Sequence, residues 1–480
     1  MIPFGELAPD VADLNTTVAK VAHNVIPGVN AYHPLPSLAV HSDALTEACK
    51  GAITPKDFEG NNYIFAGSAQ YLYSVAAGAV TDESKVGGYT NNSEKWSFIQ
   101  WGEKIVAAKM GDTPQVITLG GSTFADLAGS PPQCRTMTTI KNFLVMANTW
   151  DSTDGYKANR VWWSGYEDIE GWTPATNQSD WQDIQGKGGD IQRIVGGEYG
   201  IIFQERAIWR MSYVGTPLVF QFDEVEPGIG TPAGGSVVQH GSRIFFLGQD
   251  GFYAMADGGG PTPIGTQKID RWFYANLNKT FAHNMSAAIA PESGFVVWSY
   301  PSSASSGGSC DSLIAFNYKS GRWATGSLDT QLLLQGATSA YTLEDLDSFG
   351  DLDALGSSLD SSAWQGGAYK LAAFNSDNKM GFFSGAPMVG VLQTAEIGDN
   401  TNRSQISSVR PLIDGGCTVS LSYRDNLADS ATSTPERSVD STGKANFRTN
   451  ARYHRIQVTT TGEFTEALGV EPVVVGKGKR

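Results

Sequence analysis

The segment that decides the fold is IIFQERAIWR at residues 201–210, which joins two short apolar runs through a polar turn. The same pattern recurs in three other places: IFAGSAQYLY at 64–73, IFFLGQDGFY at 244–253 and LIAFNYKSGRW at 313–323. A short apolar run, a turn rich in Gly, Asp, Asn or Ser, and an aromatic-rich run together are typical of a β-hairpin. We therefore expect a mainly β chain built from repeated hairpins.

The spacing of these hairpins predicts a β-propeller. Comparable apolar positions, from Ile64 through Ile105 and Leu144 to Val297, follow one another at intervals of about 40–60 residues, and a four-stranded propeller blade takes roughly 40–50 residues. The longer intervals contain insertions such as the Trp-rich stretch at 159–181. We expect about six or seven blades, with a stack of β-sandwich domains as the alternative.

Composition shifts along the chain predict three regions. Residues 1–55 are rich in small and polar residues and contain Pro34 and Pro36, which favours an extended N-terminal arm on a neighbour or on the ring's own surface, with disorder as the alternative for the first 20 residues. Residues 56–390 carry the hairpins and form the propeller-like domain. Residues 391–480 have longer, more polar strands that form a second β unit or close or extend the propeller. Two short segments, 268–276 and 361–372, are the helix candidates.

Charge and cysteine content exclude several classes of protein. Asp and Glu number 49 against 34 Lys and Arg, so the formal net charge is −15, a poor match for tight phosphate binding. The four cysteines form no C-x-x-C pair, so zinc-finger spacing is absent and free thiols in a reducing compartment are expected. The N-terminal sequence predicts no signal peptide, and no apolar run is long enough to predict a membrane span.

The sequence predicts no catalytic, cofactor-binding or metal site, and therefore a protein that is not an enzyme. None of the six His residues belongs to an H-x-x-x-H pair, and neither a G-x-S-x-G elbow nor a Walker-type phosphate loop occurs. The acidic segment 345–360 invites comparison with a calcium loop, but no Glu closes it in the manner of an EF-hand. We interpret it as a solvated loop, with a loosely bound cation as the alternative.

A glycosidase is the enzymatic alternative, because propellers can carry paired carboxylates at their centre. Asp154, Asp250 and Asp311 stand in turns, two of them in the Asp-Gly pairs that are common in hairpins. The tryptophans Trp162, Trp163 and Trp172 suit either a sugar-stacking platform or, as we favour, a blade core or subunit interface.

The stretch from Asp190 to Phe273 carries a resemblance to a known family. In order, this stretch contains IWRM at 208–211, DGFY at 250–253 and IDRWF at 269–273. It resembles the tail hub proteins of short-tailed bacteriophages (podoviruses), also called packaged-DNA stabilisation proteins, and through them the tail nozzle proteins of related phages. Residues 96–108, whose pattern predicts two strands about a turn at Gly102-Glu103, and the segment RYHRI at 452–456 are similar to the same group. The likeness covers roughly residues 60–475 and is weakest over the first 55.

The resemblance implies a structural virion protein. Tail hubs of this kind are β-propeller proteins that form homohexameric rings below the portal and adaptor proteins and extend the DNA ejection channel. They retain packaged DNA and dock tail fibres, tailspikes or a needle. For this chain we accordingly expect assembly in the host cytoplasm, a place in the virion tail, double-stranded DNA passing without sequence-specific binding, no cofactor and no membrane insertion.

Three groups of residues receive roles under that hypothesis. The acidic residues Asp345, Asp347, Asp351 and Asp353 are expected to face the channel, where they would repel DNA phosphates and let it slide. The interface aromatics are expected to be Trp162, Trp163, Trp172 and Trp181. The arm containing Pro34 and Pro36 is expected to dock on the adaptor. The rival hypothesis is a carbohydrate-binding or glycan-hydrolysing propeller of a phage receptor-binding apparatus.

Overall fold

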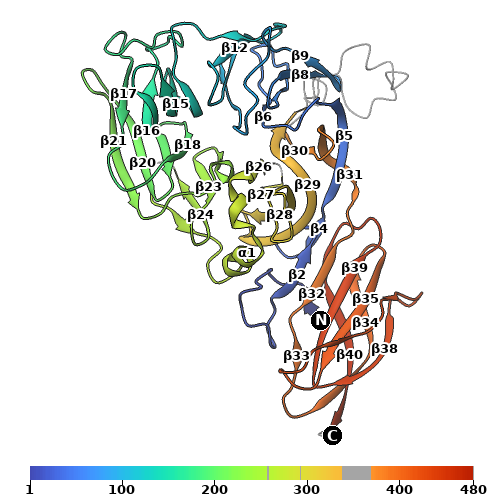
Figure 1. The fold of residues 1–480 in the computed structure, drawn as a ribbon. Coiled ribbons are helices and arrows are strands. Elements are labelled where there is room, and N and C mark those ends of the chain that lie inside the picture. Colours follow the sequence, from blue (N-terminus) through green and yellow to red (C-terminus); the bar gives the residue numbers. More distant parts are fainter. Residues whose placement is uncertain (257–258, 292, 338–368, 479–480) are drawn as a thin grey trace.

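The protein consists of a β-propeller and a β-sandwich that share strands from both ends of the chain (Figure 1). The structure is a computed structural model and describes residues 1–256, 259–291, 293–337 and 369–478. Five four-stranded antiparallel sheets and two further four-stranded units make seven blades in the described residues. The predicted mainly β, propeller-like fold is thus confirmed, and the blade count is fixed at the upper of the two expected values.

The first five blades follow the chain in order, each as a meander of four strands. Blades 1 and 2 contain β6 (Gly51–Ile53), β7 (Phe65–Gly67), β8 (Leu72–Ala76) and β9 (Ala79–Asp82), then β10 (Ser97–Trp101), β11 (Lys104–Ala108), β12 (Gln115–Thr118) and β13 (Ala125–Asp126). Blades 3 and 4 contain β14 (Gln133–Ile140), β15 (Phe143–Asp151), β16 (Gly155–Trp163) and β17 (Asp180–Asp183), then β18 (Ile191–Val195), β19 (Gly200–Gln204), β20 (Ala207–Gly215) and β21 (Val219–Pro227). Blade 5 contains β22 (Val238–His240), β23 (Arg243–Leu247), β24 (Phe252–Ala256) and β25 (Thr262–Pro263).

Blades 6 and 7 share one long strand, which is why they belong to the same sheet. Blade 6 contains β26 (Ser286–Ala290), β27 (Phe295–Tyr300), β28 (Cys310–Asn317) and the first part of β29 (Arg322–Gly336). The second part of β29 pairs with β30 (Lys370–Asn375), which is followed by β31 (Lys379–Pro387) and, at the outer edge, by β5 (Pro36–Ala44). The ring is therefore closed by a strand that comes from the N-terminal segment.

The four hairpins that decided the prediction are present as β7–β8, β19–β20, β23–β24 and β28–β29. The expected turn between β10 and β11 is also present, and Gly102 there has a φ of +55°, in the left-handed region that glycine adopts without strain. Of the two helix candidates, 268–276 is confirmed by α1 (Asp270–Asn276). In the other, residues 370–372 begin strand β30, and residues 361–368 lie outside the described residues.

The first strands of blades 2 to 6 line the central cavity, and hydroxyl side chains join neighbouring first strands. Ser97 of blade 2 accepts from the N–H of Met137 in blade 3 at 3.2 Å, and Thr136 of blade 3 accepts from Ile194 in blade 4 at 3.3 Å. Separate hydrophobic clusters fill the spaces between blades, so that each blade is buried on both faces by its neighbours.

The sandwich has two sheets. One contains β3 (Val25–Pro27), β4 (Tyr32–Pro34), β40 (Ala467–Gly478), β34 (Arg403–Ile413) and β38 (Ala445–Ala451), with β1 (Ile2–Pro3) beside β40. The other contains β2 (Ala19–His23), β32 (Val391–Thr394), β33 (Ile397–Gly398), β39 (Tyr453–Thr460), β35 (Cys417–Arg424), β36 (Thr432–Ser433) and β37 (Arg437–Ser438). Residues 391–478 thus form the sandwich together with β1 to β4 and do not close the propeller, because β5 supplies its closing strand.

The N-terminal segment differs most from the expected arm. Strands β1 to β4 are paired within the sandwich, and β5 is the outer strand of blade 7. Phe4, Leu7 and Tyr32 are almost completely buried, because they fill the space between the sandwich and the propeller. The segment is extended, as its prolines predicted, but it is an integral part of both domains.

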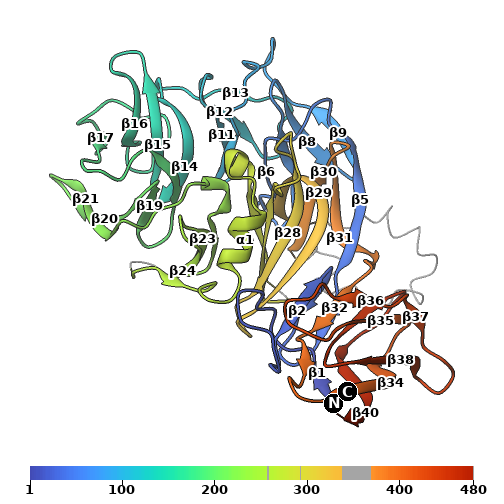
Figure 2. The same cartoon turned by 60° about the horizontal axis from the view of Figure 1, so that its bottom comes forward.

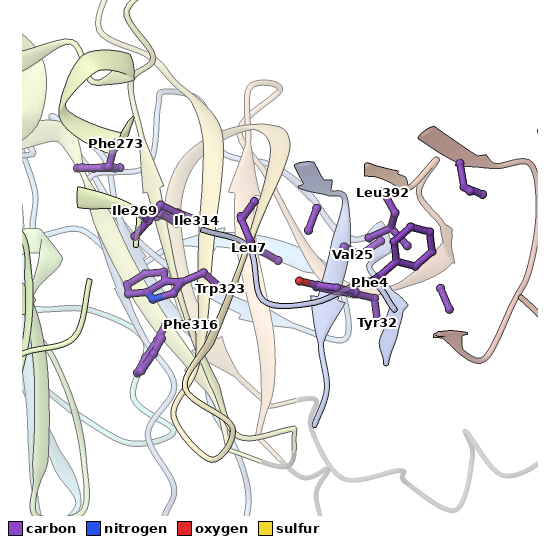
Figure 3. Close-up of a cluster of buried hydrophobic side chains, with 14 of the residues drawn as sticks. Phe4, Leu7, Val25, Tyr32, Ile269, Phe273, Ile314, Phe316, Trp323 and Leu392 are labelled. Carbon is purple, nitrogen blue, oxygen red and sulfur yellow. The ribbon is translucent and has the colours of Figure 1, made fainter. Parts of the chain in front are cut away.

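One continuous core joins the two domains. Figure 3 shows Phe273, Ile314 and Trp323 of the propeller side leading through Leu7 to Tyr32 of the sandwich side. Strand β2 pairs with β29 of the propeller and with β32 of the sandwich, and the turned view in Figure 2 shows it where the two domains meet. Such a shared apolar core holds the two domains in a fixed relation.

Candidate functional site

The central channel of the propeller contains a hollow that is lined by residues of five blades. A cavity of about 610 Å³ opens between the first strands of blades 2 to 6. Its wall is mixed: Phe98, Met137 and Val195 are apolar, Thr138 and Gln239 are polar, and Lys141 is cationic. Arg193, from β18, lies in this wall and is half-buried.

A second cation crosses the channel. Lys95 stands just before β10 in blade 2, and its Nζ donates to the carbonyl oxygens of His283 at 2.8 Å and Met285 at 3.4 Å, both at the start of blade 6. Gly235 packs against this point, because a Cβ there would lie 2.1 Å from the Met285 oxygen and 3.6 Å from Lys95 Nζ. A residue larger than glycine would therefore displace the Met285 carbonyl.

These cations influence one another. Burial, reinforced by the positive charges of Arg193 and Lys50, lowers the pKa of Lys95 to about 8. Burial alone lowers the pKa of Arg193. Lys50 stands directly before β6 of blade 1, and its Nζ donates to the Asn92 carbonyl at 3.2 Å. The channel is therefore electropositive, although the whole chain has a net charge of −15.

Acidic residues close to this end of the channel are paired with other cations. Glu94 forms a salt bridge with Arg135 at 2.7 Å, and Asp112 forms one with Lys109 at 3.3 Å. At the other end of the first strands, Lys141 pairs with Glu198 at 2.7 Å. The carboxylates around the channel thus neutralise other cations, and sequence reasoning missed the cluster because its members come from separate blades.

The structure does not bring the glycosidase candidates together. Asp154, between β15 and β16, bonds Arg160 at 2.5 Å, and Asp250, between β23 and β24, accepts from the Tyr253 hydroxyl at 2.8 Å. Asp311 in β28 accepts from both the backbone and the hydroxyl of Ser302. The three carboxylates belong to blades 3, 5 and 6, and each stabilises a local turn.

The four predicted interface tryptophans divide into two pairs. Trp163 and Trp172 are each only 3% exposed and lie in clusters between blades, with their indole N–H groups bonded to the carbonyls of Gln178 and Ile169. The interface prediction is therefore wrong for these two, because a side chain that fills the core cannot contact a partner. Trp162 and Trp181 are half-buried neighbours on β16 and β17, with ring centroids 6.5 Å apart.

Trp181 belongs to a charged cluster that the sequence did not reveal. The Arg160 guanidinium lies 3.7 Å from the Trp181 ring centroid and bonds Asp183 at 2.6 Å as well as Asp154. Arg160 is 2% exposed. Burial by itself would lower the pKa of its guanidinium, but the hydrogen bonds to Asp183 and Asp154 raise that pKa above its usual value. This cluster fastens β17 to β16 and gives Trp181 a structural role.

Pro34 and Pro36, predicted to dock on the adaptor, lie where the chain passes from the sandwich to the propeller. Pro34 ends β4 and Pro36 begins β5, so they mark the crossover from sandwich to propeller, where the chain changes sheets. The four acidic residues Asp345, Asp347, Asp351 and Asp353 lie outside the described residues.

The sandwich has a free sheet edge that the sequence also failed to indicate. The first part of β40 pairs on one side with β1 and β4, whereas residues 471–478 pair only with β34 in the described part of the chain. Three consecutive valines stand on this stretch, which is unpaired along one edge: Val473, Val474 and Val475 are 45%, 53% and 47% exposed. An exposed apolar edge strand offers backbone N–H and C=O groups to another strand.

Within residues 1–256, 259–291, 293–337 and 369–478, no group of three or more His, Cys, Asp or Glu side chains could hold a metal ion. Among the helices of that same part, none has the length and apolar character needed to cross a bilayer.

Comparisons with known proteins bear on the fold alone. No family model matches the chain, and no curated protein matches it in sequence. Similar solved structures include the extracellular domain of BT4673 from B. thetaiotaomicron (TM-score 0.42, 9% identity, 83% of this chain and 47% of that chain). They also include BamB from Moraxella catarrhalis (TM-score 0.37, 8% identity, 74% and 92%) and the computationally designed protein Ika8 (TM-score 0.37, 10% identity, 73% and 98%). This chain spans about half the length of the BT4673 domain. The propeller assignment itself follows from the sheet topology.

Proposed function

We propose that this protein is a structural virion protein, a subunit of a hexameric tail hub or nozzle ring of a short-tailed bacteriophage. The observation that carries the proposal is the unpaired apolar edge of β40, with Val473, Val474 and Val475 exposed. A long apolar edge is a liability in a monomer unless a partner covers it, and strand addition is the usual way of covering one.

A closed ring needs two different surfaces on each subunit, because its contacts are head-to-tail. The second apolar surface is the tip of the β20–β21 hairpin, where Val214 is 47% and Leu218 is 71% exposed. This hairpin lies on the opposite side of the propeller from the sandwich (Figure 1). Two apolar surfaces at opposite ends of one subunit suit such a ring, and the family resemblance sets the expected number of copies at six.

The remaining functions follow from the place of such a ring in a virion. The ring would lie below the portal and adaptor proteins, extend the DNA ejection channel, retain packaged DNA and dock fibres, spikes or a needle. The net charge of −15 suits a lumen through which double-stranded DNA passes without being held. The half-buried Trp162 and Trp181 remain candidate contacts for neighbours.

The test is the mass of the purified chain in solution, alone and with a phage portal–adaptor complex. We expect a sixfold mass in at least one of these conditions, and a Val474→Lys variant should lose it, because Lys on an edge strand opposes strand addition. Val86→Lys is the matched control, since Val86 is fully exposed but lies in the loop after β9. A wild-type chain that stays monomeric in both conditions would refute the proposal and favour the glycan-binding propeller, to be tested by glycan binding.

A further inference from the structure

The channel of the propeller combines a cavity with cations that lack a counter-charge. Arg193 and Lys141 lie in the wall of the 610 Å³ cavity, and Lys141 is paired with Glu198 at 2.7 Å. Lys95 is not part of this wall, but it crosses the channel from blade 2 to blade 6, and the charge of Arg193 acts on it. Lys95 donates to backbone carbonyls only, and the Arg193 guanidinium forms no hydrogen bond or ion pair with any described residue. The thiol of Cys310, itself buried, is the acidic group that bears on Lys95.

This arrangement is unfavourable for an empty channel. Arg193 and Lys95 are both half-buried, and taking a charged group even partly out of water without a counter-charge has a cost, so such charges in proteins are usually paired. Elsewhere in this chain that rule is followed, since the buried Arg160 has three carboxylates around it and the buried Lys109 has Asp112. The channel departs from the rule in a protein that has an excess of carboxylates.

We propose that the propeller channel binds a small dianionic oxyanion of the phosphate class at Arg193 in the cavity wall, with Lys95 as a second cation nearby. The planar guanidinium of Arg193 can donate two parallel hydrogen bonds to such an anion, and the Lys95 ammonium adds a point charge. Lys50 contributes a third positive charge from blade 1. A cavity of this volume admits a small molecule, so a phosphorylated metabolite fits as well as the free ion.

The site is independent of the proposed ring. It lies inside one propeller and uses none of the residues assigned to subunit contacts, so a monomer should bind the anion as well as a hexamer does.

The experiment is titration of the full chain with inorganic phosphate, with acetate and chloride as comparison anions at equal ionic strength. Calorimetry should show saturable phosphate binding at one site per chain, with acetate at least about tenfold weaker because it has one charge. Arg193→Met should weaken phosphate binding at least about tenfold. Arg243→Met, which removes an exposed arginine from β23 of the neighbouring blade, should leave binding unchanged.

A second readout separates an anion site from a structural role. In phosphate-free buffer Arg193→Met should raise the thermal midpoint, because it removes an unpaired cation, and phosphate should no longer raise that midpoint further. A lowered midpoint together with an intact phosphate response would overturn the proposal.

If Arg193→Met does not fold, Lys95→Met takes its place in the titration, and undiminished phosphate affinity in that variant counts against the site. Absence of saturable phosphate binding to the wild-type chain also overturns it. A phosphorylated sugar that binds more tightly than inorganic phosphate would identify a metabolite as the occupant.

Discussion

Arg322 joins the N-terminal segment to the propeller, and its replacement by Met should loosen that segment. Arg322 begins β29 and is 8% exposed. Its guanidinium donates to the carbonyl oxygens of Phe4 at 2.8 Å, Gly5 at 2.6 Å, Val29 at 3.1 Å and Gly28 at 3.3 Å. It also lies 4.6 Å from the Tyr32 ring centroid.

The magnitude can be worked out contact by contact. The Phe4 carbonyl belongs to a residue that is 1% exposed, so it would be left buried without a donor, at about 1–3 kcal/mol. The lost cation–π contact adds roughly 0.5–2 kcal/mol. Gly5 keeps the bond from the Tyr32 hydroxyl at 2.8 Å, and Val29 is exposed, so water can replace the lost bond there. Met fills the space of the arginine stem, so we expect a net loss of about 3 kcal/mol.

The assay is amide hydrogen exchange of residues 2–34 in native buffer. A loss of about 3 kcal/mol corresponds to roughly 100-fold faster exchange. Arg322→Lys should fall between Met and wild type, because it keeps the charge but loses the fork of donors. Arg243→Met on the exposed end of β23 is the control and should leave exchange unchanged. If Arg322→Met changed exchange of this segment by less than about fivefold, the assignment of Arg322 as the joining residue would be refuted.

Three further changes test other parts of the structure. Burial raises the pKa of Asp270 to about 6, so the folded state binds a proton more tightly than the unfolded state, and stability falls as pH rises from about 4 to above 6. In urea denaturation, the free energy of unfolding of Asp270→Asn should therefore exceed that of wild type by up to about 3 kcal/mol at pH 8 and equal it at pH 4. A difference that stays constant across that pH range would contradict this. Trp163→Ala should lose about 3–5 kcal/mol and Trp181→Ala about 1–2 kcal/mol, and equal losses would argue against the core position of Trp163. Burial raises the pKa of the Cys49 thiol to about 12 and also raises that of Cys134, so a thiol reagent at pH 8 should modify both at the rate of unfolding; rapid modification of the folded chain would disagree.

The hairpins and the propeller-like class could be predicted because their determinants are local. A strand of about five residues, a turn and the next strand lie within one short window, so apolar runs and turn residues such as Gly102 are sufficient to indicate β10–β11. The same holds for α1, whose apolar face and flanking turns are contiguous in sequence. These features repeat along the chain, and the repeat itself indicates the architecture.

The destination of the N-terminal segment was decided only by tertiary structure. Ile2 pairs with Val470, and Gly381 of β31 pairs with Val40 of β5. Pairings between segments hundreds of residues apart leave no periodic signal in either segment. Its prolines correctly indicated extended backbone, but extended backbone suits a free arm and an incorporated strand equally well.

Burial was likewise decided in three dimensions, and with it the candidate sites. Trp162 and Trp163 are adjacent in the sequence, yet successive side chains of a strand point to opposite faces, and Trp163 alone is packed among its neighbours in the core between blades 3 and 4. The channel cations Lys95 and Arg193 come from different blades, so their proximity arises only when the ring closes. The sequence by itself determined the repeated β-hairpins and the acidic balance of this chain, because both are sums of local properties. Which edges stay open, which aromatics are covered and which charges meet were decided by the closure of the ring and by the strands that the two domains share.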